Sequence, residues 1–206
     1  MIAVRRIQND VELLKALKLS AKAFMENDPL FLSNKVPIDD FISYYYSIKN
    51  TIMNSPFSYA LYFNNEIKAR FIGLPTIFTY THEIPKSMEY YDEFFGKKYE
   101  EHMKLINKEK CFYPVFTASF YKGGAKLLYT KLFKDLRKEG FNEMYYEMSN
   151  PINTKVFHRY GNEANWNKME KLSDEYYKDK IKVEFYKAKF NERLIPIAKP
   201  NTKNWV

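Results

Sequence analysis

Two adjacent glycines between an apolar stretch and a helical pattern constrain this chain more than any other feature. The segment at 120–133 reads FYKGGAKLLYTKLF, and the whole sequence contains only six glycines. Glycine permits positive φ angles and lets another group approach the backbone closely. The N-terminus of a following helix offers unpaired N–H groups and a positive dipole end, which suit an anion such as phosphate. An ordinary tight connection explains the same residues, so the pair alone leaves both interpretations open.

The residues around this pair predict a strand, a turn and a helix in that order. The apolar run at 111–120, CFYPVFTASF, is typical of a strand. Pro114 inside it predicts a bulge or a sheet edge, because proline cannot donate to a ladder. Residues 124–138 have helical spacing, and Gly140 is the expected C-terminal stop. The buried face of this helix is predicted to contain Ala125, Leu128, Leu132 and Leu136.

The rest of the chain mixes strand and helix patterns. Strands are predicted at 2–7, in a hairpin at 57–78 that turns at Asn64 and Asn65, and at 142–149, 166–172 and 182–190. Helices are predicted at 9–24, 38–53 and 153–161, with a helical insertion at about 80–110. This order predicts an α/β (α+β) fold, with a mixed central sheet of about six to seven strands and helices on both faces.

The first predicted helix has a clear beginning and end. Asn9 or Asp10 is the expected N-cap, and proline at position 29 ends the helix because the residue before a proline disfavours the α region. Its helical spacing is carried by Val11, Leu14, Leu17, Ala21 and Phe24.

Length and composition indicate one domain at 1–190 and an extended tail at 191–206 that contains two prolines and no periodicity. The chain shows neither a transmembrane span nor the apolar block of a secretory signal. Cys111 is the sole cysteine, which excludes a disulfide within the chain and favours a reducing compartment. We therefore expect a cytoplasmic protein without membrane attachment.

The net charge of +8 raises the question of nucleic-acid binding, but the pattern of charge argues against it. Only six of the 33 basic residues are arginine, and the lysines are spread along the chain among acids. Attraction to an acidic partner or a phosphorylated cofactor is the expected secondary effect. Three scattered histidines and one cysteine lack metal-ligand spacing, so no metal site is expected.

Two segments resemble the GNAT superfamily of acetyl-coenzyme-A-dependent N-acetyltransferases. In VFTASFYKGGAKLL, Val115 falls on the family's strand position, and Gly123 and Ala125 fill its two small-residue positions. Phe120 stands where the family has glutamine or arginine.

The second segment is NPINTKVFHRYGN, in which Asn150, Phe157 and Gly161 match the family spacing and Asn162 replaces a phenylalanine. Many members have, at the position of Phe157, a tyrosine that protonates the leaving thiolate. Tyr160 lies three residues further on and could face the same way on a helix, but core packing is the preferred interpretation.

The resemblance implies a site for acetyl-coenzyme A, here abbreviated acetyl-CoA. The diphosphate would lie on the bare backbone of Gly123 and Gly124, beside the charges of Lys122 and Lys126 and the helix start at Ala125. The pantetheine arm would enter a gap between the strands at 113–118 and 142–149. Backbone N–H groups from Val115 to Thr117 would stabilise the oxyanion. Asn150 and Phe157 belong to the same implied site.

The segment AFMENDPL, residues 23–30, resembles the corresponding part of arylalkylamine N-acetyltransferase-like proteins. In those proteins the acid before Pro-Leu is proposed to take the proton from the amine, and here that residue is Asp28. An Asp-Pro turn explains the same residue without chemistry. Glu143 and Glu147 lie on one face of the strand beside the implied gap, and solvent exposure is the default expectation for both.

Two functions follow. The first is acetyl transfer to a primary amine by direct attack. The second is a GNAT-fold protein that has lost its catalytic activity and serves as a subunit of a larger assembly. Phe120, Phe157 and Asn162, which depart from the family pattern, favour this second function. The tail at 191–206 is then a possible contact for a protein partner.

Overall fold

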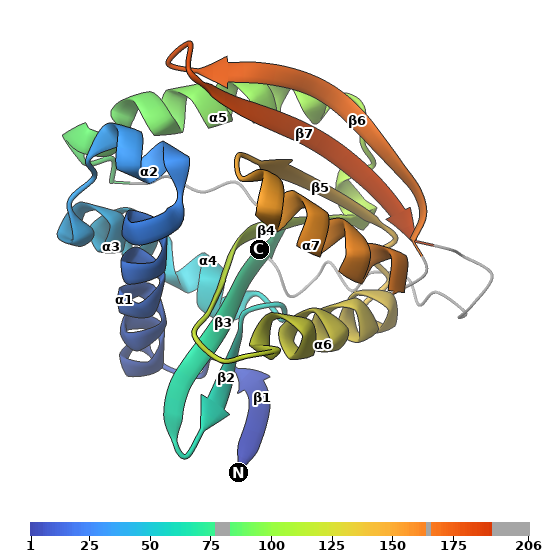
Figure 1. Ribbon diagram of the computed structural model, residues 1–206. Helices are drawn as coiled ribbons and strands as arrows, with labels where there is room; N and C mark the ends of the chain where they lie inside the picture. Colours follow the sequence, from blue (N-terminus) through green and yellow to red (C-terminus); the bar gives the residue numbers. More distant parts are fainter. Residues whose placement is uncertain (77–82, 164–165, 191–206) are drawn as a thin grey trace.

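The computed structural model describes residues 1–76, 83–163 and 166–190, and these form one mixed sheet of seven strands in the order β1-β2-β3-β4-β5-β7-β6 (Figure 1). All neighbouring strands in the sheet are antiparallel except β4 and β5, which are parallel. The strands are β1 (Ile2–Arg6), β2 (Tyr59–Phe63), β3 (Glu66–Pro75), β4 (Cys111–Ser119), β5 (Glu143–Met148), β6 (Trp166–Tyr177) and β7 (Ile181–Phe190). The predicted fold class is confirmed.

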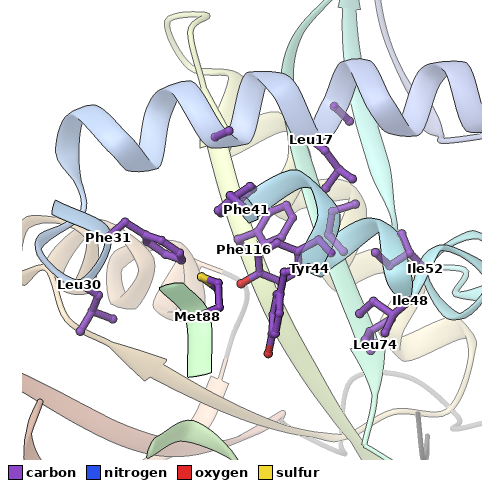
Figure 2. Close-up of a cluster of buried hydrophobic side chains, with 14 of the residues drawn as sticks. Leu17, Leu30, Phe31, Phe41, Tyr44, Ile48, Ile52, Leu74, Met88 and Phe116 are labelled. Carbon is purple, nitrogen blue, oxygen red and sulfur yellow. The ribbon is translucent and has the colours of Figure 1, made fainter. Parts of the chain in front are cut away.

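Helices cover both faces of this sheet (Figure 1). One face carries α1 (Asp10–Asn27), α2 (Pro29–Asn34), α3 (Ile38–Ser47), α4 (Lys49–Asn54) and α5 (Glu89–His102), whose buried side chains form one apolar cluster with it. The opposite face carries α6 (Gly124–Lys138) and α7 (Pro151–Glu163) over a second cluster. Figure 2 shows the first cluster, in which the rings of Phe31, Phe41 and Phe116 lie together.

Several local signals act as predicted. Asn9 caps α1, its side chain accepting from the N–H of Glu12 at 3.0 Å. Asn64 and Asn65 both have positive φ, 50° and 65°, which two-residue turns between antiparallel strands require. Gly140 follows α6 with φ 84°.

Two helical predictions need correction. Val11 is 61% exposed, because the buried face of α1 runs through Leu13, Ala16, Leu17 and Ser20. Ser20 is a polar member of that face that hydropathy does not reveal; its hydroxyl donates to the Ala16 carbonyl.

The predicted helix at 38–53 is two helices that meet at Ile48, where φ and ψ are −99° and 23°. Just before this break the Ser47 hydroxyl donates to the carbonyl of Tyr44 at 2.7 Å. Such local bonds compete with the backbone ladder of a helix.

The remaining predictions fall partly outside the described residues. The hairpin prediction at 57–78 is confirmed up to Pro75, and the helical part of 80–110 is α5, flanked by short 3₁₀ turns at Lys86–Met88 and Lys108–Lys110. Residues 77–82 and the whole tail at 191–206 lie outside the described ranges, so the expected tail stays a prediction. Within those ranges, none of the helices is both long and apolar enough to cross a membrane.

Candidate functional site

Strands β4 and β5 separate soon after they begin. Of the residues that the structure describes, the two strands pair only at Cys111–Glu143 and Phe112–Met144, although β4 continues to Ser119 and β5 to Met148. We call the opening beyond these pairs the wedge. The gap that the family resemblance implies between 113–118 and 142–149 is therefore present.

The other edge of β4 contains the bulge that Pro114 predicts. Phe116 pairs with Ile72 and Pro114 pairs with Gly73, so Val115 is the extra residue. Gly73 has no room for a side chain, because a Cβ there would lie 2.1 Å from the Phe112 ring. The bulge therefore lies where β4 separates from β5, and it changes the direction of the β4 backbone at the point where the wedge begins.

The backbone of β4 presents free groups to the wedge. The N–H of Phe120 donates to the Lys68 carbonyl on β3 at 2.8 Å. Alternate residues of an antiparallel pair point the same way, so the N–H of Ala118 also faces β3 while those of Thr117 and Ser119 face the wedge. This is the edge along which an extended ligand could pair.

A cavity of about 380 Å³ occupies the wedge. Its walls come from both sides of the sheet, since α6 and α7 line one part and the junction of α1 and α2 lines the other. Among the described residues its lining holds two carboxylates and neither lysine, arginine nor histidine, in a chain of net charge +8. The lining residues are Ala23, Phe24, Asn27, Asp28, Pro114, Val115, Phe116, Thr117, Ala118, Ser119, Ala125, Tyr129, Tyr146, Glu147, Met148, Ser149, Asn150, Asn153, Val156 and Phe157.

The glycine pair at the mouth of the cavity combines two separate requirements. Gly123 has φ 78° and open space where a side chain would stand, so its conformation requires glycine. A Cβ on Gly124 would lie 2.5 Å from the Ser119 hydroxyl, and the N–H of Gly124 donates to the Tyr121 carbonyl at 2.8 Å. Packing within the protein thus explains Gly124 without any ligand.

Open donors remain in this turn. No side chain caps α6, and within the described ranges the N–H groups of Lys122, Gly123 and Ala125 find no acceptor. The side chains of Lys122 and Lys126 are exposed beside them. Three backbone donors, two lysines and a helix N-terminus are together able to hold a diphosphate.

The second resemblance segment forms the opposite wall of the cavity. The Asn150 side chain caps α7, accepting from the N–H of Ile152 at 2.9 Å. Thr154 donates its hydroxyl to the Asn150 carbonyl, and α7 begins at Pro151, two residues before the start predicted at 153. Phe157 is buried, with its ring centroid 5.1 Å from that of Tyr129 and 4.8 Å from that of Tyr146.

Asp28 lies in the part of the cavity that α1 and α2 line. Its carboxylate caps α2, accepting from the N–H of Leu30 at 2.9 Å, so the turn interpretation of Asp28 is confirmed. Burial raises the pKa of Asp28 to about 6, against the opposing effect of hydrogen bonds from the N–H groups of Leu30 and Phe31 and from Ser149.

Glu147 is the second carboxylate of the cavity, and its expected exposure is wrong. The side chain is half-buried and accepts a hydrogen bond of 2.5 Å from the Tyr113 hydroxyl. Burial raises its pKa to about 7, although the bond from Tyr113 opposes the shift. Glu143, on the same face of β5, is buried and forms an ion pair of 3.1 Å with Lys189. Alternation could not reveal this, because β5 lies inside the sheet with both of its faces covered.

Comparisons with known proteins rest on structure, since no family model and no curated protein matches the sequence. The C-terminal condensation domain of Ebony in complex with beta-alanyl-dopamine superposes with a TM-score of 0.74 at 12% identity, over 91% of this chain and 99% of that one. Arylalkylamine N-acetyltransferase 2 from Aedes aegypti gives 0.66 at 16% identity, over 92% and 99%. A putative acetyltransferase from Salmonella typhimurium, solved with its cofactor acetyl-CoA, gives 0.55 at 10% identity, over 96% and 98%. This chain has the GNAT fold.

The departures from the GNAT sequence pattern can now be placed. Phe120 is 47% exposed beside the glycine turn, and the Lys22 ammonium lies 5.9 Å from its ring centroid. Phe157 fills the space between two tyrosines and has no proton to donate. The Tyr129 hydroxyl, 2.9 Å from that of Thr117, brings a phenol to the same part of the cavity that sequence reasoning did not identify.

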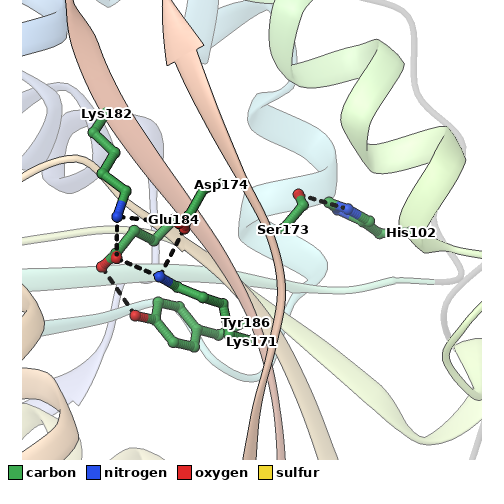
Figure 3. A network of polar contacts seen from close by, with 7 residues as sticks. All are labelled: His102, Lys171, Ser173, Asp174, Lys182, Glu184 and Tyr186. Atoms are coloured by element: carbon green, nitrogen blue, oxygen red, sulfur yellow. Dashed lines mark hydrogen bonds and ion pairs between the residues drawn. The ribbon is translucent and has the colours of Figure 1, made fainter.

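Of the described residues outside the cavity, Cys111 and His102 are buried within the protein. Cys111 is fully buried and burial raises the pKa of its thiol, so it is a poor nucleophile. His102 lies between the hydroxyls of Tyr145 and Ser173, each 3.1 Å from a ring nitrogen. Figure 3 shows the contact with Ser173. Over the described part of the chain, no three histidine, cysteine or acidic side chains are grouped to hold a metal ion.

Proposed function

We propose that this protein is an acetyl-CoA-dependent N-acetyltransferase that transfers the acetyl group to a primary amine by direct attack in a ternary complex. The wedge carries the proposal, since its cavity is lined from both sides of the sheet and can admit a thioester from one side and an amine from the other. Two similar structures support it by their own descriptions, one as an arylalkylamine N-acetyltransferase and one as a putative acetyltransferase with acetyl-CoA.

The cofactor fits the groups that line the wedge and the turn. The pantetheine arm would pair with the free edge of β4 at Thr117, and the diphosphate would take the open N–H groups of Lys122, Gly123 and Ala125. Lys126 would add charge, and Asn150 and Phe157 would form the wall opposite β4. Acetyl-CoA would supply the activated acyl group.

The protein's own groups would then act on the reacting atoms. A backbone N–H of the segment from Val115 to Thr117, where the bulge lies, would stabilise the oxyanion. An amine is protonated at neutral pH and must lose a proton before it attacks, which a carboxylate in the cavity can accept. Asp28 is the residue that the family resemblance assigns to this step.

The alternative is a GNAT-fold subunit without catalysis. Two observations favour it: Phe157 has no hydroxyl for the leaving thiolate, and packing alone explains Gly124. A protein contact through the tail at 191–206 would belong to this alternative. Under either function we propose a reducing, cytoplasmic setting, because Cys111 is the sole cysteine.

Calorimetric titration with acetyl-CoA, followed by measurement of thiol release with a panel of amines, distinguishes the two functions. The enzyme requires saturable binding and thiol release that depends on the amine. The variant Lys122→Ala/Lys126→Ala should weaken binding of acetyl-CoA, while Lys15→Ala/Lys18→Ala on α1 is a control with the same charge change. Binding without turnover, or no binding, would leave the non-catalytic subunit.

A further inference from the structure

Glu147 stands across the wedge from the bulge of β4. The last paired residues are Phe112 and Met144, and three positions further along each parallel strand are Val115 (112 + 3) and Glu147 (144 + 3). The wedge has opened there, and both residues line the cavity. A thioester carbonyl held at the bulge would therefore face this carboxylate.

The two carboxylates of the cavity differ in how fully the protein already uses them. Asp28 accepts from the N–H groups of Leu30 and Phe31 and from Ser149, and these bonds fix the start of α2. Glu147 accepts from the Tyr113 hydroxyl and from its own N–H. Because a carboxylate offers about four acceptor positions, Glu147 keeps more of its capacity for a ligand.

Among the described residues, none places a positive charge beside Glu147. The groups that face it are the phenols of Tyr113 on β4, Tyr145 on β5 and Tyr91 on α5, together with Asp28 across the cavity. No cation of the described residues acts on its titration. A half-buried carboxylate among neutral phenols is stabilised by any cation that enters, and an ammonium group is a cation of suitable size and donor capacity.

We propose that Glu147 is the catalytic residue that binds the ammonium of the acceptor and takes its proton, whereas Asp28 is a positioning residue that holds α2 and Ser149. The inference rests on the proposed function. One proton passes from R–NH₃⁺ to the Glu147 carboxylate, and the nitrogen lone pair forms the C–N bond at the thioester carbon. The C–S bond breaks, the second proton reaches the departing thiolate, and the products are the acetamide, the thiol and one proton that Glu147 releases to water.

The inference extends to the class of acceptor. A cavity with two carboxylates and no basic side chain among its described lining favours neutral or cationic substituents on the amine. It disfavours acceptors that carry a carboxylate near the amine. That carboxylate would lie beside Asp28 or Glu147, and no basic side chain of the described lining would balance its charge. Amines of similar size with and without a carboxylate test this point.

The test compares Glu147→Gln with Glu143→Gln, the same change on the same face of the same strand. We expect Glu147→Gln to lower kcat/KM for the amine by about 10²–10⁴-fold and to abolish the acidic limb of its pH profile, with unchanged affinity for acetyl-CoA. Glu143→Gln should retain the pH profile. Tyr113→Phe, which removes the hydrogen bond to Glu147, should shift the acidic limb to higher pH and keeps the proposal testable if Glu147→Gln does not fold.

Each other outcome is decisive. Unchanged kcat/KM and pH profile in Glu147→Gln would refute its role while leaving acetyl transfer intact. An acidic limb that disappears in Asp28→Asn and persists in Glu147→Gln would assign the proton to Asp28. A wild-type protein that releases no thiol with any amine would refute the proposed function and this role together.

Discussion

The two ends of β5 hold the same side chain in two different environments. At its start β5 has β4 on one side and β7 on the other, and Glu143 there pairs with Lys189 and accepts the N–H of Asn107 at 3.2 Å. At its end β5 still pairs with β7 but no longer with β4, and Glu147 faces the cavity among phenols. The difference shows that separation of one neighbouring strand converts a structural carboxylate position into one that a ligand can reach.

Replacement of Phe112 by alanine tests the end of the wedge at which β4 and β5 are still paired, here called the closed end. This replacement should have the largest effect on stability. Its ring is fully buried against Phe57 and Phe71, and loss of such a ring costs about 3–5 kcal/mol. Denaturant unfolding of Phe112→Ala measures this, and Val115→Ala at the open end is the control with a smaller expected loss. Equal losses would show that the two ends are packed alike.

The pH dependence of stability tests the environment of Glu147 at the open end of the wedge, where β4 and β5 are apart. Because Glu147 has a folded-state pKa of about 7 against 4.5 as the ordinary value, the folded state binds more protons between these pH values. Its contribution therefore lowers the free energy of unfolding as pH rises from about 4.5 to 7, by about 2–3 kcal/mol. Glu147→Gln should reduce this slope and leave the part that Asp28 contributes, since the pKa of Asp28 is also raised, to about 6. Activity that needs the ionised Glu147 carboxylate should rise over the same range. A slope in the variant that is as steep as in the wild-type protein would contradict the raised pKa of Glu147.

Asn150 lies just beyond the open end of β5, and its removal should have a moderate effect. Asn150→Ala removes the N-cap of α7, which costs about 1 kcal/mol. Thermal unfolding measures the loss, with the exposed Asn153→Ala as control. A larger effect on acetyl-CoA affinity than on stability would indicate that the Asn150 side chain also contacts the cofactor.

The smallest effect is expected on the far side of β5, where β6 and β7 carry an exposed network of charges. Lys171 contacts Asp174 at 2.7 Å and Glu184 at 2.6 Å, and Lys182 contacts the same acids (Figure 3). Exposed pairs are screened by solvent and contribute little. Lys171→Ala should leave Tm and turnover within error, and a clear loss of turnover would extend the site to this surface.

The sequence predicts the fold wherever a backbone requirement selects the residue. Gly123 needs a positive φ, Asn64 and Asn65 form the hairpin turn, and Pro114 forces the bulge. Each of these signals is local, so it can be read without knowledge of the neighbouring strands.

The site is predictable to a lesser degree because it depends on what faces each residue. Glu147 is read as exposed because alternation does not show that β5 is covered on both faces. Gly124 is read as space for a ligand, whereas Ser119 and Ala69 fill that space. The buried guanidinium of Arg70, bonded to the Ala16 carbonyl and to Ser20, gives no signal in the sequence at all.

The early parting of β4 and β5 has a mechanical consequence. Strands β1–β4 and β5–β7 are two half-sheets whose shared ladder is very short, so bending about that short ladder requires little change elsewhere in the sheet. A cofactor arm that bonded to the free edge of each half-sheet would act as an added strand and make the two halves one stiff unit. Slower amide exchange along β4 and β5, far from the diphosphate, would then accompany cofactor binding.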